Sequence, residues 1–233
     1  MQQFNKFLEL FNNPLVKTRS VTRYSGVIQN NKESLSDHIA DVCSLAYLMS
    51  RKLISLGVEV DVGKLLERCV VHDFDEVLIG DIPRLTKYAT KTIHDELDQI
   101  ARVVAKGVSE QIDGTDYTYQ VWDQAKDKSV EGFILKVVDI LSVSKKVIEE
   151  IDFSSNMTFC KVADEVRLYV GDLVEIALNA DYLPDEAKNY LVEVLNGTLI
   201  VMTDICKENA TKIDTYGIVD DITSYILDNR DKN

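Results

Sequence analysis

The sequence predicts an all-α fold, on three observations. Almost every long segment places its apolar residues at the 3.6-residue period of an amphipathic helix. Three prolines and ten glycines among 233 residues leave few forced breaks. The weak strand-like alternation at residues 58–62 lies between Gly57 and Gly63, which leave it too short to join a sheet. We therefore expect a single domain built from helices.

The first expected helix spans residues 36–56. Ser36 is a candidate N-cap, because a serine hydroxyl can accept a hydrogen bond from the first turn, and Gly57 is a candidate terminator. The apolar face steps mostly by three and four residues, through Ile39, Val42, Cys43, Ala46, Met49 and Leu53.

A second helix is expected from about residue 62 to residue 72, continuing or kinking through Val77. The segment 80–83 then breaks the pattern, because glycine and proline both disfavour a continuing helix. Another helix is expected from about residue 90 to residue 108, before a turn at residues 113–115.

The rest of the chain is expected to be helical as well. Thr92 and Asp95 have capping-box spacing near the start of the helix after residue 90, and Pro184 suits a first helical turn. The further helices are expected near residues 117–126, 130–151, 157–180, 185–208 and 217–228.

Composition limits the kinds of partner. Acidic residues outnumber basic residues by 39 to 26, which gives a net charge of −13. This balance argues against binding polymeric nucleic acid, whose affinity rests on neutralising phosphates. A small phosphorylated substrate remains compatible, because a local cluster of basic side chains can act within an acidic protein.

The sequence also predicts a cytoplasmic protein. The four cysteines form no CxxC pair, and Cys43 and Cys69 fall on apolar helical faces, as buried thiols of a reducing compartment do. The N-terminal residues lack the basic start and long apolar stretch of a signal peptide. No window reaches the ~18 apolar residues of a membrane span, so we expect no membrane association.

A metal site is predicted from three motifs that lie far apart in the chain. The dipeptide His72-Asp73 follows the apolar-rich stretch LLERCVV, His38 lies upstream in SLSDHIADV, and Asp139 lies downstream in ILKVVDILS. Two imidazoles and two carboxylates suit one divalent cation. Successive residues of a regular helix point about 100° apart, so ligands at 72 and 73 require a helix end or a local irregularity.

Acidic and basic residues surround these candidate ligands. Glu76 lies four residues after His72 on the same side of a near-helical segment, where a carboxylate could orient or deprotonate water. Asp81 follows at a turn. A metal ringed by basic side chains suits a phosphoryl group. The basic residues near these acids are Arg19, Arg23, Arg84, Lys87, Lys91 and Lys136.

Taken singly, each of these residues has a simpler explanation. A buried histidine is more often a hydrogen-bonded core residue, Glu76 and Asp81 alone would be solvated acids, and Lys136 alone could lie along the surface. A second dipeptide, His94-Asp95, follows no apolar run and is interpreted as a surface or capping pair. The ordered set of motifs, rather than any one member, therefore supports a metal site.

The motifs resemble a known superfamily of enzymes. His38, His72-Asp73 and Asp139 are similar to the H…HD…D signature of HD-domain phosphohydrolases. The run HDFDEVLIGDIPRLTKY (72–88) resembles the corresponding run of bacterial 5′-deoxynucleotidases. Arg23-Tyr24 corresponds to an Arg-Trp pair in that branch, so Tyr24 departs from the family pattern.

The resemblance covers roughly residues 15–150 and implies an HD-domain helical bundle with additional C-terminal helices. We expect residues 1–154 to form the phosphohydrolase core. Residues 155–233 are expected to form a C-terminal helical extension packed on the same domain. The family resemblance and the abundant apolar helical surface also imply a homodimer.

The resemblance implies a role for each matching residue. Glu76 would activate the attacking water, Asp81 would contact the sugar and help to exclude ribonucleotides, and Tyr24 could stack on the sugar or base. One divalent cation (cobalt, manganese, magnesium or zinc) would be held by His38, His72, Asp73 and Asp139. Phosphate would be bound by Arg23, Lys87 and, more weakly, Lys136.

We therefore expect a metal-dependent phosphohydrolase that releases phosphate from small-molecule deoxynucleoside 5′-monophosphates. A deoxynucleoside triphosphate triphosphohydrolase is the alternative, because related HD proteins act on triphosphates and the extra basic residues could serve a longer phosphate chain. A further alternative is a non-catalytic nucleotide-binding HD protein, which would have less need of Glu76 and Asp81. A cyclic-nucleotide or alarmone hydrolase is disfavoured, because a second metal-binding histidine pair and the accessory domains are missing.

Overall fold

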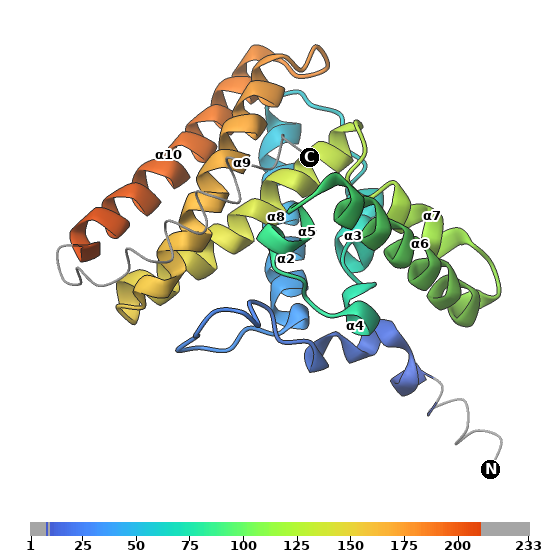
Figure 1. The fold of residues 1–233 in the computed structure, drawn as a ribbon. Helices are drawn as coiled ribbons and strands as arrows, with labels where there is room; N and C mark the ends of the chain where they lie inside the picture. The colour runs from blue at the N-terminus through green and yellow to red at the C-terminus, as the bar shows by residue number, and fades with distance from the viewer. Residues whose placement is uncertain (1–7, 9, 211–233) are drawn as a thin grey trace.

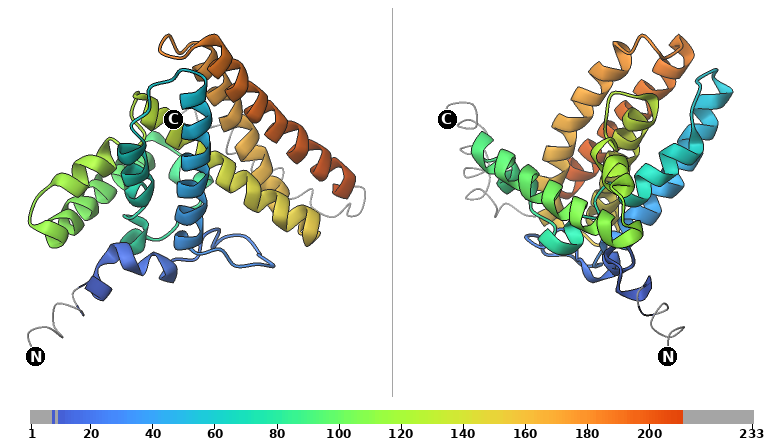
Figure 2. Two further views of the ribbon diagram at one scale, coloured as in Figure 1. Left: turned by 180° about the vertical axis from the view of Figure 1, so that it is seen from behind. Right: turned by 90° about the vertical axis from the view of Figure 1, so that its right-hand side faces the viewer.

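Helix α8 (Val130–Ile148) lies at the centre of the fold, and four other helices pack around it (Figure 1). Helices α2 (Leu35–Ser55) and α3 (Val62–Val71) pack against α8 and against each other. Helix α9 (Cys160–Leu178) packs on another side of α8, and α10 (Asp185–Ala210) lies along α9. Figure 2 shows the α9–α10 pair on one flank of this centre and the pair of α6 (Lys91–Asp113) and α7 (Tyr117–Asp123) on the opposite flank.

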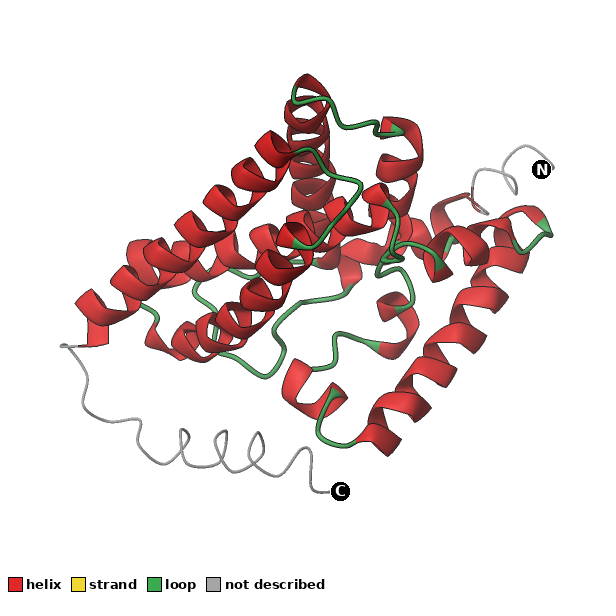
Figure 3. Cartoon of the chain, turned by 90° about the horizontal axis from the view of Figure 1, so that it is seen from above, coloured by secondary structure: helices red, strands yellow, loops and turns green. Residues whose placement is uncertain are grey.

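The computed structural model describes residue 8 and residues 10–210. Within this part of the chain no strand occurs, and a single isolated antiparallel bridge joins Thr22 and Ser34. Figure 3 shows helices joined by loops throughout it. The prediction of an all-α fold is confirmed. No helix in the described residues combines the length and the apolar character that crossing a membrane requires.

The shorter elements lie between these helices and beside them. Helix α6 pairs with α7, and a small second core between them and the end of α3 contains Val71, Phe74, Ala105 and Val108. The remaining elements are the 3₁₀ helix η1 (Pro14–Ser20), α4 (Glu76–Ile79), α5 (Arg84–Lys87), α6 (Lys91–Asp113), α7 (Tyr117–Asp123), the π-helix η2 (Glu149–Phe153) and the 3₁₀ helix η3 (Met157–Phe159).

The main core extends from the N-terminal helices into the last two. Leu53 of α2, Leu135 of α8, Leu173 of α9 and Leu195 of α10 belong to one continuous cluster of buried side chains. Helix α8 is apolar on most sides because it contacts α2, α3, α9 and α10. Residues 160–210 therefore share the core of the preceding helices.

Two helix starts differ from the sequence prediction. Ser34, rather than Ser36, caps α2, because Ser34 and Asp37 form a reciprocal capping box in which each side chain accepts the other's backbone N–H. Thr90, rather than the Thr92–Asp95 pair, caps α6, since Thr90 has the extended backbone of an N-cap and accepts from Ile93.

Two helix ends differ as well. Helix α6 continues five residues past its expected end at 108, to Asp113, where Gly114 adopts the left-handed conformation with φ 74°. The predicted helix 130–151 changes to a π-helix at Glu149. The helix predicted at residues 217–228 lies outside the described residues.

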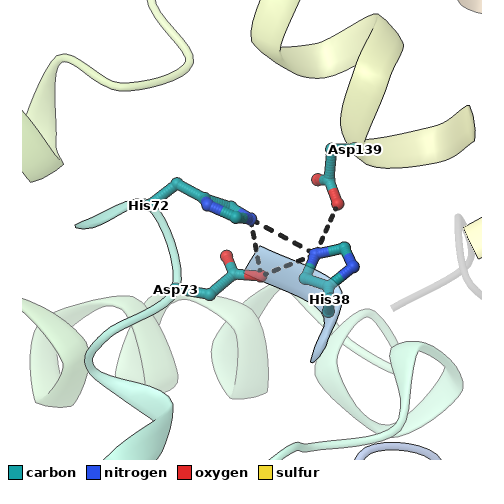
Figure 4. Close-up of side chains that lie close together, drawn as sticks. All are labelled: His38, His72, Asp73 and Asp139. Carbon is teal, nitrogen blue, oxygen red and sulfur yellow. Dashed lines mark hydrogen bonds and ion pairs between the residues drawn. The ribbon is translucent and has the colours of Figure 1, made fainter. Parts of the chain in front are cut away.

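The chain leaves the helical path directly after α3. His72 is the C-cap of α3, residues 72–75 form turns, and the short helix α4 begins at Glu76. Gly80 ends α4 with φ 80°, a conformation that glycine adopts without steric cost. This interruption allows His72 and Asp73, although adjacent in sequence, to approach one point from different directions (Figure 4).

The loop between α7 and α8 is held in place by Arg68 of α3. This side chain is 1% exposed, and its two terminal nitrogens bond the two carboxylate oxygens of Asp127 at 3.0 and 2.9 Å. The same guanidinium bonds the hydroxyl of Ser129, the N-cap of α8, at 2.8 Å. Asp127 also packs on Gly132, where an added Cβ would lie 2.6 Å from the Asp127 carbonyl oxygen and 2.8 Å from its nitrogen.

Gly132→Ala should therefore destabilise the protein, by about 1–3 kcal/mol as expected for overpacking, because the added methyl group would displace backbone atoms of Asp127. Gly107→Ala is the matched control, since Gly107 also lies within a helix and an added Cβ there meets no atom within 4 Å. The control should be neutral or stabilising by up to about 1 kcal/mol. Thermal unfolding of both variants measures the difference. Equal stability of the two would contradict the close packing of this loop.

Candidate metal centre

Four side chains from three separate segments of the chain converge on one point (Figure 4). His38 lies in the first turns of α2, His72 ends α3, Asp73 follows in the turn, and Asp139 lies in the middle of α8. One potential ligand atom from each lies within 4.8 Å of the other three. In the part of the chain that the structure describes, this is the single group of three or more such side chains that could hold a metal.

Both imidazoles direct the same ring nitrogen inward. Nδ1 of His72 lies 2.8 Å from the carbonyl oxygen of Cys69, which can only accept, so this nitrogen carries the proton. Nδ1 of His38 lies 3.0 Å from the Ser142 hydroxyl. The two Nε2 atoms are left facing each other at 3.3 Å. Two such lone pairs require a proton or a cation between them, and outward Nδ1 bonds are typical of metal-binding histidines.

The two carboxylates complete the ligand set. Oδ1 of Asp139 lies 3.2 Å from Nε2 of His38, and Oδ2 of Asp73 lies 3.0 Å from Nε2 of His72. Burial alone would raise the pKa of Asp73, but neighbouring His72 and Lys126 hold it well below its usual range, so this carboxylate is ionised. Burial and then the nearby Arg23 lower the pKa of His38 to about 4, which keeps it neutral. These donors therefore fit a divalent cation.

Glu76 lies beside this cluster as the first residue of α4. Its Oε2 atom is buried and, among the described residues, has no hydrogen-bond partner. Burial, followed by the charge of Asp73, raises the pKa of Glu76 well above its usual range. A carboxylate in this environment has the proton affinity that a general base needs.

Arg23 connects the cluster to a second acid. One terminal nitrogen lies 3.6 Å from Oδ2 of Asp73, and Nε lies 3.3 Å from Oε1 of Glu33. The guanidinium is buried, and the amide of Gln29 donates to the Arg23 carbonyl at 2.6 Å. Glu33 was not predicted from the sequence, because it lies in a polar loop whose contacts only the folded chain defines.

A buried acid holds the loop that carries Arg23 in place. Glu150 of η2 accepts hydrogen bonds from the backbone N–H groups of Asn30 and Asn31, both at 2.9 Å, and from Nζ of Lys146 at 2.8 Å. Glu150 is fully buried, and these bonds replace the solvation that it loses. The π-helix therefore fixes the loop between Arg23 and α2.

Asp81 and Tyr24 are joined to each other. The Asp81 carboxylate accepts a hydrogen bond from the backbone N–H of Tyr24, which has a left-handed φ of 55°. The Tyr24 ring packs against Phe159 with centroids 5.3 Å apart, and its buried hydroxyl has no hydrogen-bond partner in the part of the chain that the structure describes. In this structure Asp81 therefore fixes the backbone of the Arg23–Tyr24 pair.

A pocket of about 340 Å³ opens beside the metal ligands. His72, Asp73 and Glu76 are among the residues that line it. Of the predicted phosphate-binding residues, Lys87 is exposed and lines the pocket. Lys136 does not line it and donates to the carbonyl oxygen of Asp127 at 3.2 Å.

Three further residues of the pocket were missed by the sequence analysis. Nζ of Lys126 lies 2.6 Å from Oδ2 of Asp139, and Nε1 of Trp122 donates to Asp75 at 3.0 Å. His94, interpreted from the sequence as a surface residue, also lines the pocket. Lys126 gave no signal, because it lies in the short polar loop AKDKS whose path depends on the Arg68–Asp127 contact.

The helical fold of this chain is the one found in HD-domain phosphohydrolases. Solved structures with the same fold include an HD-domain phosphohydrolase from Listeria innocua, with a TM-score of 0.63 and 22% identity over 88% of this chain and 99% of that one. Another is the cyanophage S-2L HD phosphohydrolase DatZ, with a TM-score of 0.50 and 15% identity over 81% of this chain and 96% of that one. That structure contains dA and one catalytic Zn²⁺ ion.

The chain belongs to the YfbR-like 5′-deoxynucleotidase family, whose model matches residues 10–188. A 5′-deoxynucleotidase from Photorhabdus laumondii is 25% identical over 143 residues, which are 59% of this chain and 71% of that protein. A 5′-deoxynucleotidase from Klebsiella pneumoniae is 23% identical over 145 residues, which are 61% of this chain and 73% of that protein.

Asp73→Asn should lower the affinity for Co²⁺ by at least about tenfold, because it removes an anionic ligand of the centre, and even supporting groups of metal sites contribute 10–100-fold. Asp75→Asn is the control: Asp75 is two residues away and buried, but its carboxylate accepts from Trp122 instead. Isothermal titration of both variants with Co²⁺ measures the difference. Wild-type affinity in Asp73→Asn would remove Asp73 from the ligand set.

Proposed function

We propose that the protein is a metal-dependent 5′-deoxynucleotidase, which hydrolyses deoxynucleoside 5′-monophosphates to deoxynucleosides and inorganic phosphate. The observation that carries the proposal is the convergence of His38, His72, Asp73 and Asp139 within 4.8 Å, beside Glu76, whose buried Oε2 atom has no hydrogen-bond partner among the described residues. Membership of the YfbR-like family supports the substrate class. The dA in the DatZ structure supports a deoxynucleoside ligand in this fold.

The metal ion, Glu76 and Arg23 have complementary roles in this proposal. A divalent cation held by them would supply Lewis-acid stabilisation of the phosphoryl oxygens. Glu76 accepts a proton from the water that attacks phosphorus, the bond between phosphorus and the 5′ oxygen breaks, and the leaving oxygen takes up a proton. Arg23, held between Asp73 and Glu33, places its positive charge where negative charge develops.

Asp81 and Tyr24 are proposed to select the sugar. The bond from the Tyr24 N–H to the Asp81 carboxylate keeps the two residues together. If the Asp81 carboxylate lies near the 2′ carbon of the sugar, it would disfavour a ribonucleotide, because no space is left there for the 2′ hydroxyl. Lys87 is proposed as a phosphate contact, and Lys136 as a weaker one.

Four finer expectations belong to this proposal. Zinc, cobalt, manganese and magnesium remain the candidate cations, and the zinc of DatZ supports a transition metal. A homodimer is supported by large exposed side chains on the last helices, Leu168, Leu178 and Ile200. The free thiols support a cytoplasmic location. The shared core supports packing of residues 160–210 on the preceding helices, and the rest of the expected extension 155–233, from residue 211 on, lies outside the described residues.

The proposal predicts turnover of dAMP with inorganic phosphate as the product. The purified protein should be assayed with dAMP and dATP in the presence of Co²⁺ or Mn²⁺, and the products separated by chromatography. Release of triphosphate from dATP with no action on dAMP would favour a triphosphohydrolase instead. Binding of both nucleotides without any product would favour a non-catalytic binding protein.

Glu76→Gln should reduce kcat for dAMP by about 10²–10⁴-fold, because the amide cannot accept the proton from water. The substitution keeps the size of the side chain, and Glu76 is not among the four ligands, so Co²⁺ affinity should stay within about twofold of wild type. The comparison needs steady-state kinetics and a Co²⁺ titration on the same preparation. An unchanged kcat would exclude Glu76 as the general base.

A further inference from the structure

Lys126 occupies a position at the centre that the proposed reaction does not use. It lies in the loop between α7 and α8, and its Nζ is 2.6 Å from Oδ2 of Asp139 and 3.7 Å from Oδ1 of Asp73. A positive charge thus lies against both acidic ligands.

One oxygen of each carboxylate faces the imidazoles, and the other oxygen faces this lysine. Nε2 of His38 faces Oδ1 of Asp139 and Oδ2 of Asp73, whereas Lys126 contacts the opposite oxygen of each. A cation among the imidazole nitrogens would use the oxygens that face them. The ammonium group can therefore remain in place when the cation binds.

The ammonium group also faces the pocket. Lysine has three N–H donors, and the 2.6 Å contact with Asp139 occupies one of them. The side chain is 36% exposed, and it lines the same pocket as Glu76 and Lys87. A donor is therefore available to a ligand that lies in the pocket beside the metal ligands.

The other cations near the centre are placed differently. Among the described residues that line the pocket, the lysines and arginines are Lys87, Arg102 and Lys126. Arg102 is paired with Asp98 and Asp123. Arg23 contacts Asp73 but does not line the pocket. Lys126 is thus the basic residue of the pocket that also contacts the metal ligands.

The loop holds Lys126 firmly. Asp127, the next residue, is clamped by two bonds from buried Arg68, and Ala125, the preceding residue, is 2% exposed. A lysine fixed at both neighbours loses less conformational freedom on binding a ligand than a free surface lysine would.

We propose that Lys126 binds the phosphoryl group of the substrate from the pocket side, as a second fixed cation beside the metal and across from Arg23. This inference rests on the proposed function, since it assumes that a phosphate ester lies at the centre. It assigns the lysine a direct contact with a phosphoryl oxygen, in addition to its contacts with Asp139 and Asp73.

A role limited to neutralising the two carboxylates makes a different prediction. Such a lysine would compete with the metal for negative charge, and its removal would tighten metal binding without affecting phosphate. A phosphate-binding lysine lowers phosphate affinity when it is removed, whatever happens to the metal. The two roles therefore separate in binding measurements that need no turnover.

The experiment compares Lys126→Met with wild type in two titrations. The first titrates Co²⁺ into metal-free protein, and the second titrates inorganic phosphate into Co²⁺-loaded protein. Lys126→Met should bind Co²⁺ at least as tightly as wild type and bind phosphate roughly 10-fold or more weakly, as the loss of one charge-assisted hydrogen bond predicts. Lys126→Arg should recover part of the phosphate affinity.

Lys128→Met is the matched control, because Lys128 lies two residues away on the same loop, is exposed and does not line the pocket. Its phosphate affinity should equal that of wild type. An equal loss of phosphate affinity in Lys126→Met and Lys128→Met would mean that only the net charge of the protein matters, and it would overturn the proposal. Unchanged phosphate affinity in Lys126→Met, or a wild-type protein that binds no phosphate, would overturn it as well.

The proposed function and the role of Lys126 can fail separately. A wild-type protein that hydrolyses no deoxynucleotide, but whose phosphate affinity still depends on Lys126, would refute the nucleotidase activity and leave the phosphate contact standing. An active nucleotidase whose phosphate affinity is independent of Lys126 would refute the contact alone.

Discussion

Two inward-facing imidazole nitrogens, 3.3 Å apart, impose the constraint on which the rest of the site depends. Each histidine is fixed by an outward bond, His72 to the Cys69 carbonyl and His38 to the Ser142 hydroxyl, so neither ring can turn away without breaking it. The partners lie on α3 and α8, helices of the main core. Packing of that core therefore determines the geometry at which a cation is held.

Negative and positive side chains alternate with increasing distance from this point. Asp73 and Asp139 surround the imidazoles, and Arg23 and Lys126 contact these carboxylates from different sides. Glu33 then faces Arg23. An overall charge of −13 hides this arrangement, because the basic side chains that matter are few and buried or half-buried. The electrostatics of the site thus come from fixed pairs rather than from net charge.

Much of the fold and the four metal-binding candidates could be predicted from the sequence. Helical periodicity was strong along α2 and α8, which carry His38 and Asp139, and His72-Asp73 follows directly at the end of α3. The exact caps were harder, because Ser34 and Ser36 both suit an N-cap and only the reciprocal bond with Asp37 distinguishes them. Local preference alone could not choose between two such serines.

The residues that the sequence could not reveal reach the site through loops. Glu33 pairs with Arg23 and Lys126 pairs with Asp139, in each case across a distance in sequence that no periodicity encodes. Their positions depend on the Glu150 and Arg68 contacts that anchor the two loops. Sequence patterns report the regular elements, whereas these contacts form only when those elements have packed together.

A crystal structure of the zinc-loaded protein, with anomalous scattering recorded at the zinc edge, tests the account most directly. The account predicts one strong anomalous peak about 2.0–2.2 Å from Nε2 of His38, Nε2 of His72 and one oxygen each of Asp73 and Asp139. A peak bound elsewhere, or histidines that still face each other with no metal between them at saturating zinc, would contradict it.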